Sequence, residues 1–245
     1  MDRAALQAIV RAEDRHWWFV GRRRIVGRVL EDLSLEPGAR LLEAGCGGGG
    51  NLPLMARFGE VSALELDEEA CAAARSRGIG TVCLGSLPHA FPFVGQQFDV
   101  ILLLDVLEHL TEPEASLRVL ADALSDDGHL IVTVPAYQWL WTQHDVLNHH
   151  VRRFTVDTLS EQLAAAGFTL TLGSYFNSAL FPVAVMARLA SRFGRQAKEV
   201  AGLSIPVGNE MLAGLFGSER HIASRGWLPF GLSVLGVARR SEAAA

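Results

Sequence analysis

Short apolar runs alternate with amphipathic helical patterns through the middle of the chain. Runs that predict strands buried on both faces lie at 40–44, 61–65, 81–84, 98–104 and 129–134. Helical patterns separate them at 52–58, 67–77 and 112–124, and an Asp-Asp-Gly turn at 126–128 precedes the fifth run. Strands and helices that alternate at this spacing form a parallel sheet with right-handed crossovers. The pattern therefore predicts an α/β fold.

Composition narrows the class of protein. The chain has 245 residues, is 49% hydrophobic and carries a net charge of −5. This length and hydrophobicity suit one sizeable core with an appendage, and the acidic balance disfavours a nucleic-acid partner. The three cysteines have no metal or disulfide spacing, there is no signal-peptide pattern, and no apolar stretch is long enough to span a membrane. These features predict a cytoplasmic protein with reduced thiols.

Residues 41–51, LLEAGCGGGGN, place five glycines directly after the first predicted strand. In parallel sheets, ligands bind beyond the carboxyl ends of the strands, where the strand order reverses. Glycines let the backbone approach a ligand closely, and the following helix N-terminus attracts negative charge. A tight turn alone would need only one or two glycines. The loop is therefore predicted to bind a ligand.

Two glycine spacings leave two ligands open. Gly45, Gly47 and Gly50 fit G-x-G-x-x-G, the dinucleotide signature. With Glu43 in front, Gly45, Gly47 and Gly49 instead resemble the E-x-G-x-G-x-G pattern of S-adenosylmethionine (SAM) methyltransferases. A carboxylate repels a pyrophosphate and attracts the ammonium of a methionine, so Glu43 favours SAM. Glu65, at the end of the second predicted strand, is placed to bind ribose hydroxyls in either ligand.

Residues 98–110, FDVILLLDVLEHL, and 63–78, ALELDEEACAAARSRG, resemble class I SAM methyltransferases. The resemblance implies a Rossmann-like, doubly wound sheet of seven strands with an antiparallel last strand. By this resemblance a helix lies at 155–166, and strands six and seven lie at 168–174 and 232–239. Ser86 departs from the family, which often has an aspartate there for the adenine. The implied cofactor-binding residues are Glu43, Gly45, Gly47, Gly49, Glu65, Leu66, Ser86, Leu87, Leu104, Asp105 and Val106.

The resemblance also divides the chain. Residues 37–174 and 230–245 form the predicted SAM-binding core, residues 1–36 an N-terminal helical lid, and residues 175–229 a helical insertion between strands six and seven. The aromatic residues at 16–19 suit either a lid or an anchor on the sheet. The insertion is predicted to contain an amphipathic helix with basic residues towards one end, which are Arg188, Arg192, Arg195 and Lys198. It is expected to cover the substrate, touch a membrane surface or form a homodimer interface.

The segment after the fifth strand, 135–154, is rich in polar and aromatic residues. Together with the early HWWF sequence, it resembles a bacterial subgroup with methyltransferase domains of type 11 or type 23. Histidine suits proton removal at neutral pH, so the candidate catalytic residues are His144, His150 and Asp145. The candidate substrate-binding residues are Trp17, Tyr137, Trp141, Arg152, Arg153 and His109. His144, Asp145, His149 and His150 lack a clear metal-ligand spacing, so no metal site is predicted.

The sequence thus predicts a SAM-dependent methyltransferase that acts on oxygen or nitrogen of a small-molecule acceptor. A sugar, a lipid-linked sugar and an acidic metabolite remain open as acceptors. The residues after Leu104 lack the [DNS]-P-P-[YFW] pattern, which disfavours methylation of nucleic-acid bases. The alternatives are a non-catalytic SAM-binding protein and an NAD-type oxidoreductase. The latter is disfavoured by Glu43 and by the absence of a second mononucleotide-binding half.

Overall fold

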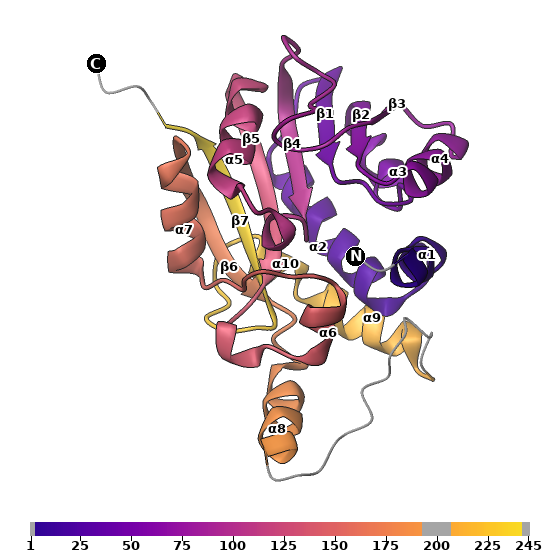
Figure 1. Ribbon diagram of the computed structural model, residues 1–245. Helices are drawn as coiled ribbons and strands as arrows, with labels where there is room; N and C mark the ends of the chain where they lie inside the picture. The colour runs from indigo at the N-terminus through magenta and orange to yellow at the C-terminus, as the bar shows by residue number, and fades with distance from the viewer. Residues whose placement is uncertain (1–2, 193–206, 242–245) are drawn as a thin grey trace.

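A seven-stranded sheet forms the centre of the molecule (Figure 1). The computed structural model describes residues 3–192 and 207–241. The strand order is β3-β2-β1-β4-β5-β7-β6. The strands are β1 (Ala39–Ala44), β2 (Gly59–Glu65), β3 (Thr81–Leu84), β4 (Phe98–Leu104), β5 (Leu124–Pro135), β6 (Phe168–Phe176) and β7 (Ser233–Arg240).

All the neighbouring strand pairs are parallel except those that β7 makes with β5 and β6. The predicted seven-stranded sheet with an antiparallel last strand is therefore confirmed. The order reverses between β1 and β4, which pair from Leu41 and Val100 onward. Loops after these two strands leave the same edge of the sheet and diverge, which creates the crevice where ligands bind in such folds.

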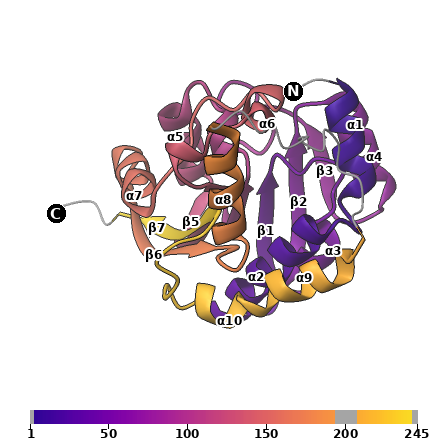
Figure 2. The same cartoon turned by 90° about the horizontal axis from the view of Figure 1, so that it is seen from below.

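Helices cover both faces of the sheet (Figure 2). On one face, α5 (Pro113–Asp122) and α7 (Val156–Ala165) bury leucines against β4 and β5. The other face carries α2 (Trp17–Asp32), α3 (Leu52–Met55), α4 (Glu68–Ser76), α9 (Asn209–Ser218) and α10 (Arg220–Ala223). The remaining helical elements are α1 (Arg3–Ala12), α6 (Gln143–Leu147), α8 (Phe181–Arg192) and the short 3-10 turns η1 (Leu107–His109) and η2 (Gln138–Leu140).

The N-terminal helices and the insertion pack against each other. Helix α9 lies along α2, as both views show. Phe216 of α9 is 1% exposed; its ring stacks on Phe176 of β6 and lies 5.3 Å and 5.8 Å from the rings of Trp18 and Trp17. Adjacent aromatic rings add to the stabilisation from buried area. The two tryptophans therefore anchor the N-terminal segment to the insertion and the sheet.

Most predicted elements are present with shifted ends. The third and fourth strands have the predicted bounds, whereas β2, β6 and α3 differ from prediction by two or three residues at one end. The predicted turn at 126–128 is wrong, because β5 already begins at Leu124. The register shifts between Phe98 and Val100, which pair with Leu124 and His129, so the Asp-Asp-Gly segment forms a bulge within the strand.

The predicted helical insertion contains α8, α9 and α10, while Arg195 and Lys198 lie outside the described residues. None of the described helices combines the length and apolar character needed to cross a membrane.

All three cysteines are unpaired, with Cys46 and Cys71 buried and Cys83 partly buried. These thiols have no disulfide partner, as the cysteine spacing predicts.

Replacement of Phe216 tests the anchor between α2, α9 and the sheet. Phe216→Ala should lower the free energy of unfolding by about 3–5 kcal/mol, because it leaves a cavity among three aromatic rings. Leu215→Ala, on the same helix and 45% exposed, should cost less than about 1 kcal/mol. Urea unfolding of both variants measures the difference. Equal losses would mean that α9 is not anchored through Phe216.

Candidate functional site

The candidate site lies at the edge of the sheet where β1, β2, β4 and β5 end. The glycine loop follows β1 there, and Gly45, Gly47 and Gly49 have φ of +82°, +55° and +78°. A Cβ on Gly45 would lie 2.6 Å from Val106 Cγ2, and one on Gly47 would lie 2.6 Å from Glu13 Oε1. Both backbone conformation and space therefore require glycine at these positions.

Glu65 joins the end of β2 to the glycine loop. Its Oε2 accepts a hydrogen bond from Gly47 N at 2.8 Å, and its Oε1 accepts hydrogen bonds from Leu66 N and Asp67 N at 2.8 Å and 3.0 Å. These backbone donors fix the carboxylate at the rim of the loop. Oε2, which accepts one of these bonds, has further acceptor capacity for a hydroxyl group.

Glu43 is a buried acid beneath the loop. Its Oε1 accepts a hydrogen bond from Asn51 Nδ2 at 2.6 Å, and its Oε2 is buried without a hydrogen-bond partner among the described residues. Burial raises the pKa of Glu43 to about 7, even though the Asn51 hydrogen bond and Arg22 lower it. A cationic ligand group beside Glu43 would favour the ionised form and satisfy the unpaired oxygen.

The N-terminal segment contributes two site residues that the sequence did not identify. Glu13, after α1, is 5% exposed and accepts hydrogen bonds from Gly48 N and Gly50 N, both at 2.8 Å. Arg22, on α2, is 7% exposed and forms an ion pair with Asp105. Neither residue belongs to a recognisable sequence motif, because each contacts residues that are distant in the sequence.

Asp105, directly after β4, connects this segment to the sheet. Its Oδ2 accepts from Arg22, and its Oδ1 accepts from Thr133 Oγ1 of β5 at 3.0 Å. Its own N–H donates to Thr133 O at 2.9 Å, and its φ is +55°, a conformation that aspartate adopts more readily than most residues. The predicted cofactor residue Asp105 is thus fixed by three bonds at the end of β4.

The other predicted cofactor residues lie at the same edge. Leu104 ends β4 and is buried, Val106 follows Asp105, and Leu66 follows β2 with 72% exposure. Ser86 N and O both bond to the backbone of Ala90, so the loop after β3 forms a small bridge that presents Ser86 and Leu87. Their roles in cofactor binding remain predictions.

The segment after β5 holds a buried histidine–carboxylate pair. Asp145 is fully buried, and its Oδ1 lies 2.8 Å from His150 Nδ1 and 2.7 Å from Arg153 Nε. Burial alone would raise the pKa of Asp145, but hydrogen bonds from His150 and Arg153 outweigh it and hold the pKa below the usual range. Asp145 is therefore ionised, so His150 carries its proton on Nδ1 and donates it to the carboxylate.

His150 also meets the turn after β4. The rings of His109 and His150 are 4.6 Å apart and nearly perpendicular, and Val151 N donates to Glu108 O at 2.9 Å. Burial and the neighbouring His150 lower the pKa of His109 to about 4, so His109 is neutral at pH 7. Burial and Asp105 raise the pKa of Glu108, whose Oε2 is buried without a hydrogen-bond partner among the described residues.

A metal-ligand set is present that the sequence did not indicate. Glu108, His109 and His150 each place one ligand atom within 4.8 Å of the other two. Imidazole nitrogens and a carboxylate are ligands of zinc-type ions. Two of these residues follow β4 and the third follows β5, so only the fold brings them together. The predicted absence of a metal site concerned His144, Asp145, His149 and His150, of which only His150 belongs to this set, and it remains a prediction.

The predicted aromatic residues Trp17 and Tyr137 lie in different parts of the molecule. Trp17 packs between α2 and α9, whereas Tyr137 stacks on Tyr175 with ring centroids 5.1 Å apart.

The two predicted arginines both form hydrogen bonds within the protein. The guanidinium of Arg153 donates to both Asp145 oxygens and to Ala136 O, and Arg152 donates to Leu110 O at 3.1 Å. Trp141 is partly buried after η2, and the side chain of His144 lies outside the described residues. Arg153 is therefore already bound to Asp145.

Comparison with known proteins identifies the family of the chain. A family model described as a methyltransferase domain matches residues 19–172. A protein of Mycobacterium tuberculosis named as a probable S-adenosylmethionine-dependent methyltransferase is 32% identical over 157 residues, covering 62% of this chain and 56% of that protein. A ubiquinone biosynthesis O-methyltransferase of Ruegeria pomeroyi is 36% identical over 114 residues, covering 43% and 46%. The chain thus spans about half the length of these relatives.

Solved structures share the fold. The protein solved in complex with the Trm112 methyltransferase activator of Haloferax volcanii has a TM-score of 0.64 at 16% identity, covering 99% of both chains. Magnesium protoporphyrin IX methyltransferase of Synechocystis, solved with bound S-adenosylhomocysteine, has a TM-score of 0.60 at 16% identity, covering 98% of this chain and 95% of that one. From the match over residues 19–172, the chain belongs to the methyltransferase domain family, and it shares the fold of class I methyltransferases.

Proposed function

We propose that this protein transfers the methyl group of SAM to an oxygen or nitrogen atom of a small-molecule acceptor, with His150 as the general base. The observation that carries the proposal is the buried Asp145–His150 pair, which meets His109 of the turn after β4. An oxygen or nitrogen nucleophile loses a proton at or after attack, and a positioned imidazole can take it at neutral pH. The relatives include ubiquinone biosynthesis O-methyltransferases, which supports the same reaction class.

The residues at the glycine loop fit SAM. The buried, unpaired Glu43 Oε2 suits the methionine ammonium, and Glu65 at the rim suits the ribose hydroxyls. Gly45, Gly47 and Gly49 let the loop adopt the left-handed conformation that directs its backbone towards the ligand. Bound SAM supplies an electrophilic methyl group, and the protein aligns it with the acceptor. The contacts of Glu13 with the loop support the proposal that residues 1–36 form a lid.

His150 would act through its second ring nitrogen. Asp145 accepts the Nδ1 hydrogen, so Nε2 is the ring nitrogen that would take the acceptor proton. The ionised Asp145 then stabilises the imidazolium that forms. Arg153 holds Asp145 in place from the other side, and the neutral His109 adds no opposing charge. These residues therefore orient the base and stabilise its protonated form.

An aromatic cluster beside this segment supports an acceptor with a flat apolar surface. Tyr137 contacts Tyr175, Trp139 and Phe181, and Phe181 contacts Phe230. Trp139 and Phe230 are 47% and 44% exposed, so part of the cluster is open to a ligand. Aromatic faces pack well on the apolar face of a sugar ring. A sugar or lipid-linked sugar therefore suits the cluster better than an acidic metabolite does, since Arg153 is bound to Asp145.

Loss of the Glu65 carboxylate should weaken SAM binding. Glu65→Ala removes charge-assisted hydrogen bonds to the ribose and should raise the Kd about 10- to 100-fold. Isothermal titration calorimetry with SAM and S-adenosylhomocysteine measures this change, with Glu60→Ala at the exposed start of β2 as the control. An unchanged Kd in Glu65→Ala would contradict the cofactor assignment.

The pKa of Glu43 predicts a pH dependence of SAM binding. Below pH 7 Glu43 is protonated in the free protein, so binding of the ammonium must release a proton. The affinity should therefore rise about tenfold between pH 5.5 and 7. Glu43→Gln should bind more weakly at pH 7 and lose most of this rise. Calorimetry across the pH range tests both, and an equal rise in the variant would place the titrating group elsewhere.

The base assignment predicts a loss of turnover without a loss of cofactor. His150→Ala should slow methyl transfer about 10²- to 10⁴-fold while the Kd for SAM changes little, because general-base catalysis contributes about this factor. His129→Ala, at the opposite end of the sheet, is the control. Single-turnover transfer to a panel of sugar and lipid-linked sugar acceptors provides the readout. Wild-type turnover in His150→Ala would remove His150 from the reaction.

A further inference from the structure

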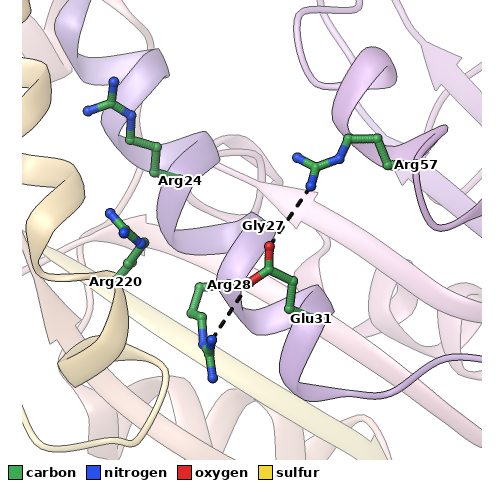
Figure 3. A pocket seen from close by; sticks show the side chains of 6 residues that line it. All are labelled: Arg24, Gly27, Arg28, Glu31, Arg57 and Arg220. Carbon is green, nitrogen blue, oxygen red and sulfur yellow. Dashed lines mark ion pairs between the residues drawn. The ribbon is translucent and has the colours of Figure 1, made fainter.

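A basic hollow lies on the outer side of α2, formed by segments distant in the sequence. It has a volume of about 290 Å³ and is lined by Arg24, Gly27, Arg28, Glu31, Arg57 and Arg220. Arg24 to Glu31 belong to α2, Arg57 follows α3, and Arg220 begins α10 (Figure 3). We call these four arginines the arginine groove. Four arginines and one glutamate thus line the hollow, on a protein whose net charge is −5.

Glu31 does not neutralise the groove. Its carboxylate lies 3.7 Å from Arg28 and 4.0 Å from Arg57, the two contacts drawn as dashed lines in Figure 3. Arg28 also pairs with Asp32 on the same helix. Among the described residues, neither Arg24 nor Arg220 forms an ion pair with a carboxylate. Two of the four cations therefore have no anionic partner within the described part of the chain.

The same two arginines are held in position by backbone carbonyls. Arg24 Nη1 donates to Ala213 O at 2.9 Å, and Arg220 Nη1 donates to Gly217 O at 3.3 Å. Each bond uses one of the five N–H donors of a guanidinium, so other donors remain for a ligand. Because the acceptors lie on α9, the packing of α9 against α2 fixes the spacing of the two groups. The site is thus partly preorganised.

The groove extends towards the glycine loop. A second hollow of about 420 Å³ shares Arg24 and Arg57 with the first and adds Arg23, Leu54 and Gly50 among its lining residues. Gly27 allows the close approach of α3 to α2, since a Cβ there would lie 3.1 Å from Leu54 Cδ1. This approach brings Arg57 beside α2. The arginines therefore line a continuous surface that is separate from the His150 side of the molecule.

We infer that the arginine groove binds a phosphate-bearing ligand. Guanidinium groups recognise phosphate oxygens by bidentate hydrogen bonds, and several of them suit the charge of a diphosphate. A hollow of about 290 Å³ accommodates a small anionic group better than a large apolar ligand. The phosphate could belong to a free diphosphate compound or to a lipid headgroup. This binding does not depend on the methyl-transfer reaction, because none of the four arginines belongs to the proposed catalytic site.

Binding of inorganic pyrophosphate to the full chain, measured by calorimetry at low salt, tests the inference. The double variant Arg24→Gln/Arg220→Gln should bind pyrophosphate at least about 10-fold more weakly than wild type. Arg118→Gln/Arg240→Gln, which removes the same charge from other surfaces, should bind like wild type. SAM affinity and the melting temperature of each variant are measured in parallel. Arg57→Gln serves as a second groove variant, because the 65% exposed Arg57 side chain is not needed for folding.

Flotation with vesicles distinguishes the two sources of phosphate. Binding to phosphatidylglycerol vesicles but not to phosphatidylcholine vesicles, lost in the groove variants, assigns a lipid headgroup. Pyrophosphate binding without vesicle binding assigns a free phosphate compound. The inference is overturned if wild type binds neither probe, or if the groove and control variants lose binding equally.

Discussion

A largely buried ion pair between Arg22 and Asp105 joins the N-terminal helices to the sheet at the edge where the candidate site lies. Removal of one partner from a buried pair leaves an uncompensated charge, which typically costs about 3–5 kcal/mol. Asp105 also bonds to Thr133 of β5, so one carboxylate connects α2, β4 and β5. The position of the glycine loop relative to α2, and hence the contacts of Glu13, depends on this junction.

The three consecutive arginines of α2 illustrate how one helix serves separate surfaces. Neighbouring residues of an α-helix point about 100° apart, so a run of like charges need not share a face. Arg22 points to Asp105, Arg23 donates to the backbone carbonyls of Glu13 and Asp14, and Arg24 lies on the outer groove. The run therefore supports the candidate methyl-transfer site, the N-terminal segment and the arginine groove at the same time.

Sequence patterns predicted the strands and loops whose formation depends on the residues within them. Strands buried on both faces are continuous apolar runs, so β4 had the predicted bounds, and the glycine loop follows β1 as expected. The edge strand β3 also had the predicted bounds, although its end residues Thr81 and Leu84 are exposed. The pairing of Asp145 could not be predicted in this way. His149 has a φ of +57°, and the next residue, His150, is joined to Asp145 through both backbone and side chain. Contacts such as Glu13 with Gly48 depend on tertiary packing alone.

The acids around the glycine loop have a consequence for the direction of ligand exchange. Glu13, Glu43, Glu65 and Asp105 lie around this part of the molecule. Arg22 pairs with Asp105 and Arg77 with Glu13, which leaves Glu65 and, once ionised, Glu43 without a cationic partner among the described residues. SAM carries a sulfonium cation, whereas S-adenosylhomocysteine is a neutral thioether at the same atom. A negative surrounding therefore attracts the incoming cofactor more strongly than the spent one. Methyl transfer itself removes part of the electrostatic attraction that holds the nucleoside, so the chemical step favours its replacement by fresh cofactor.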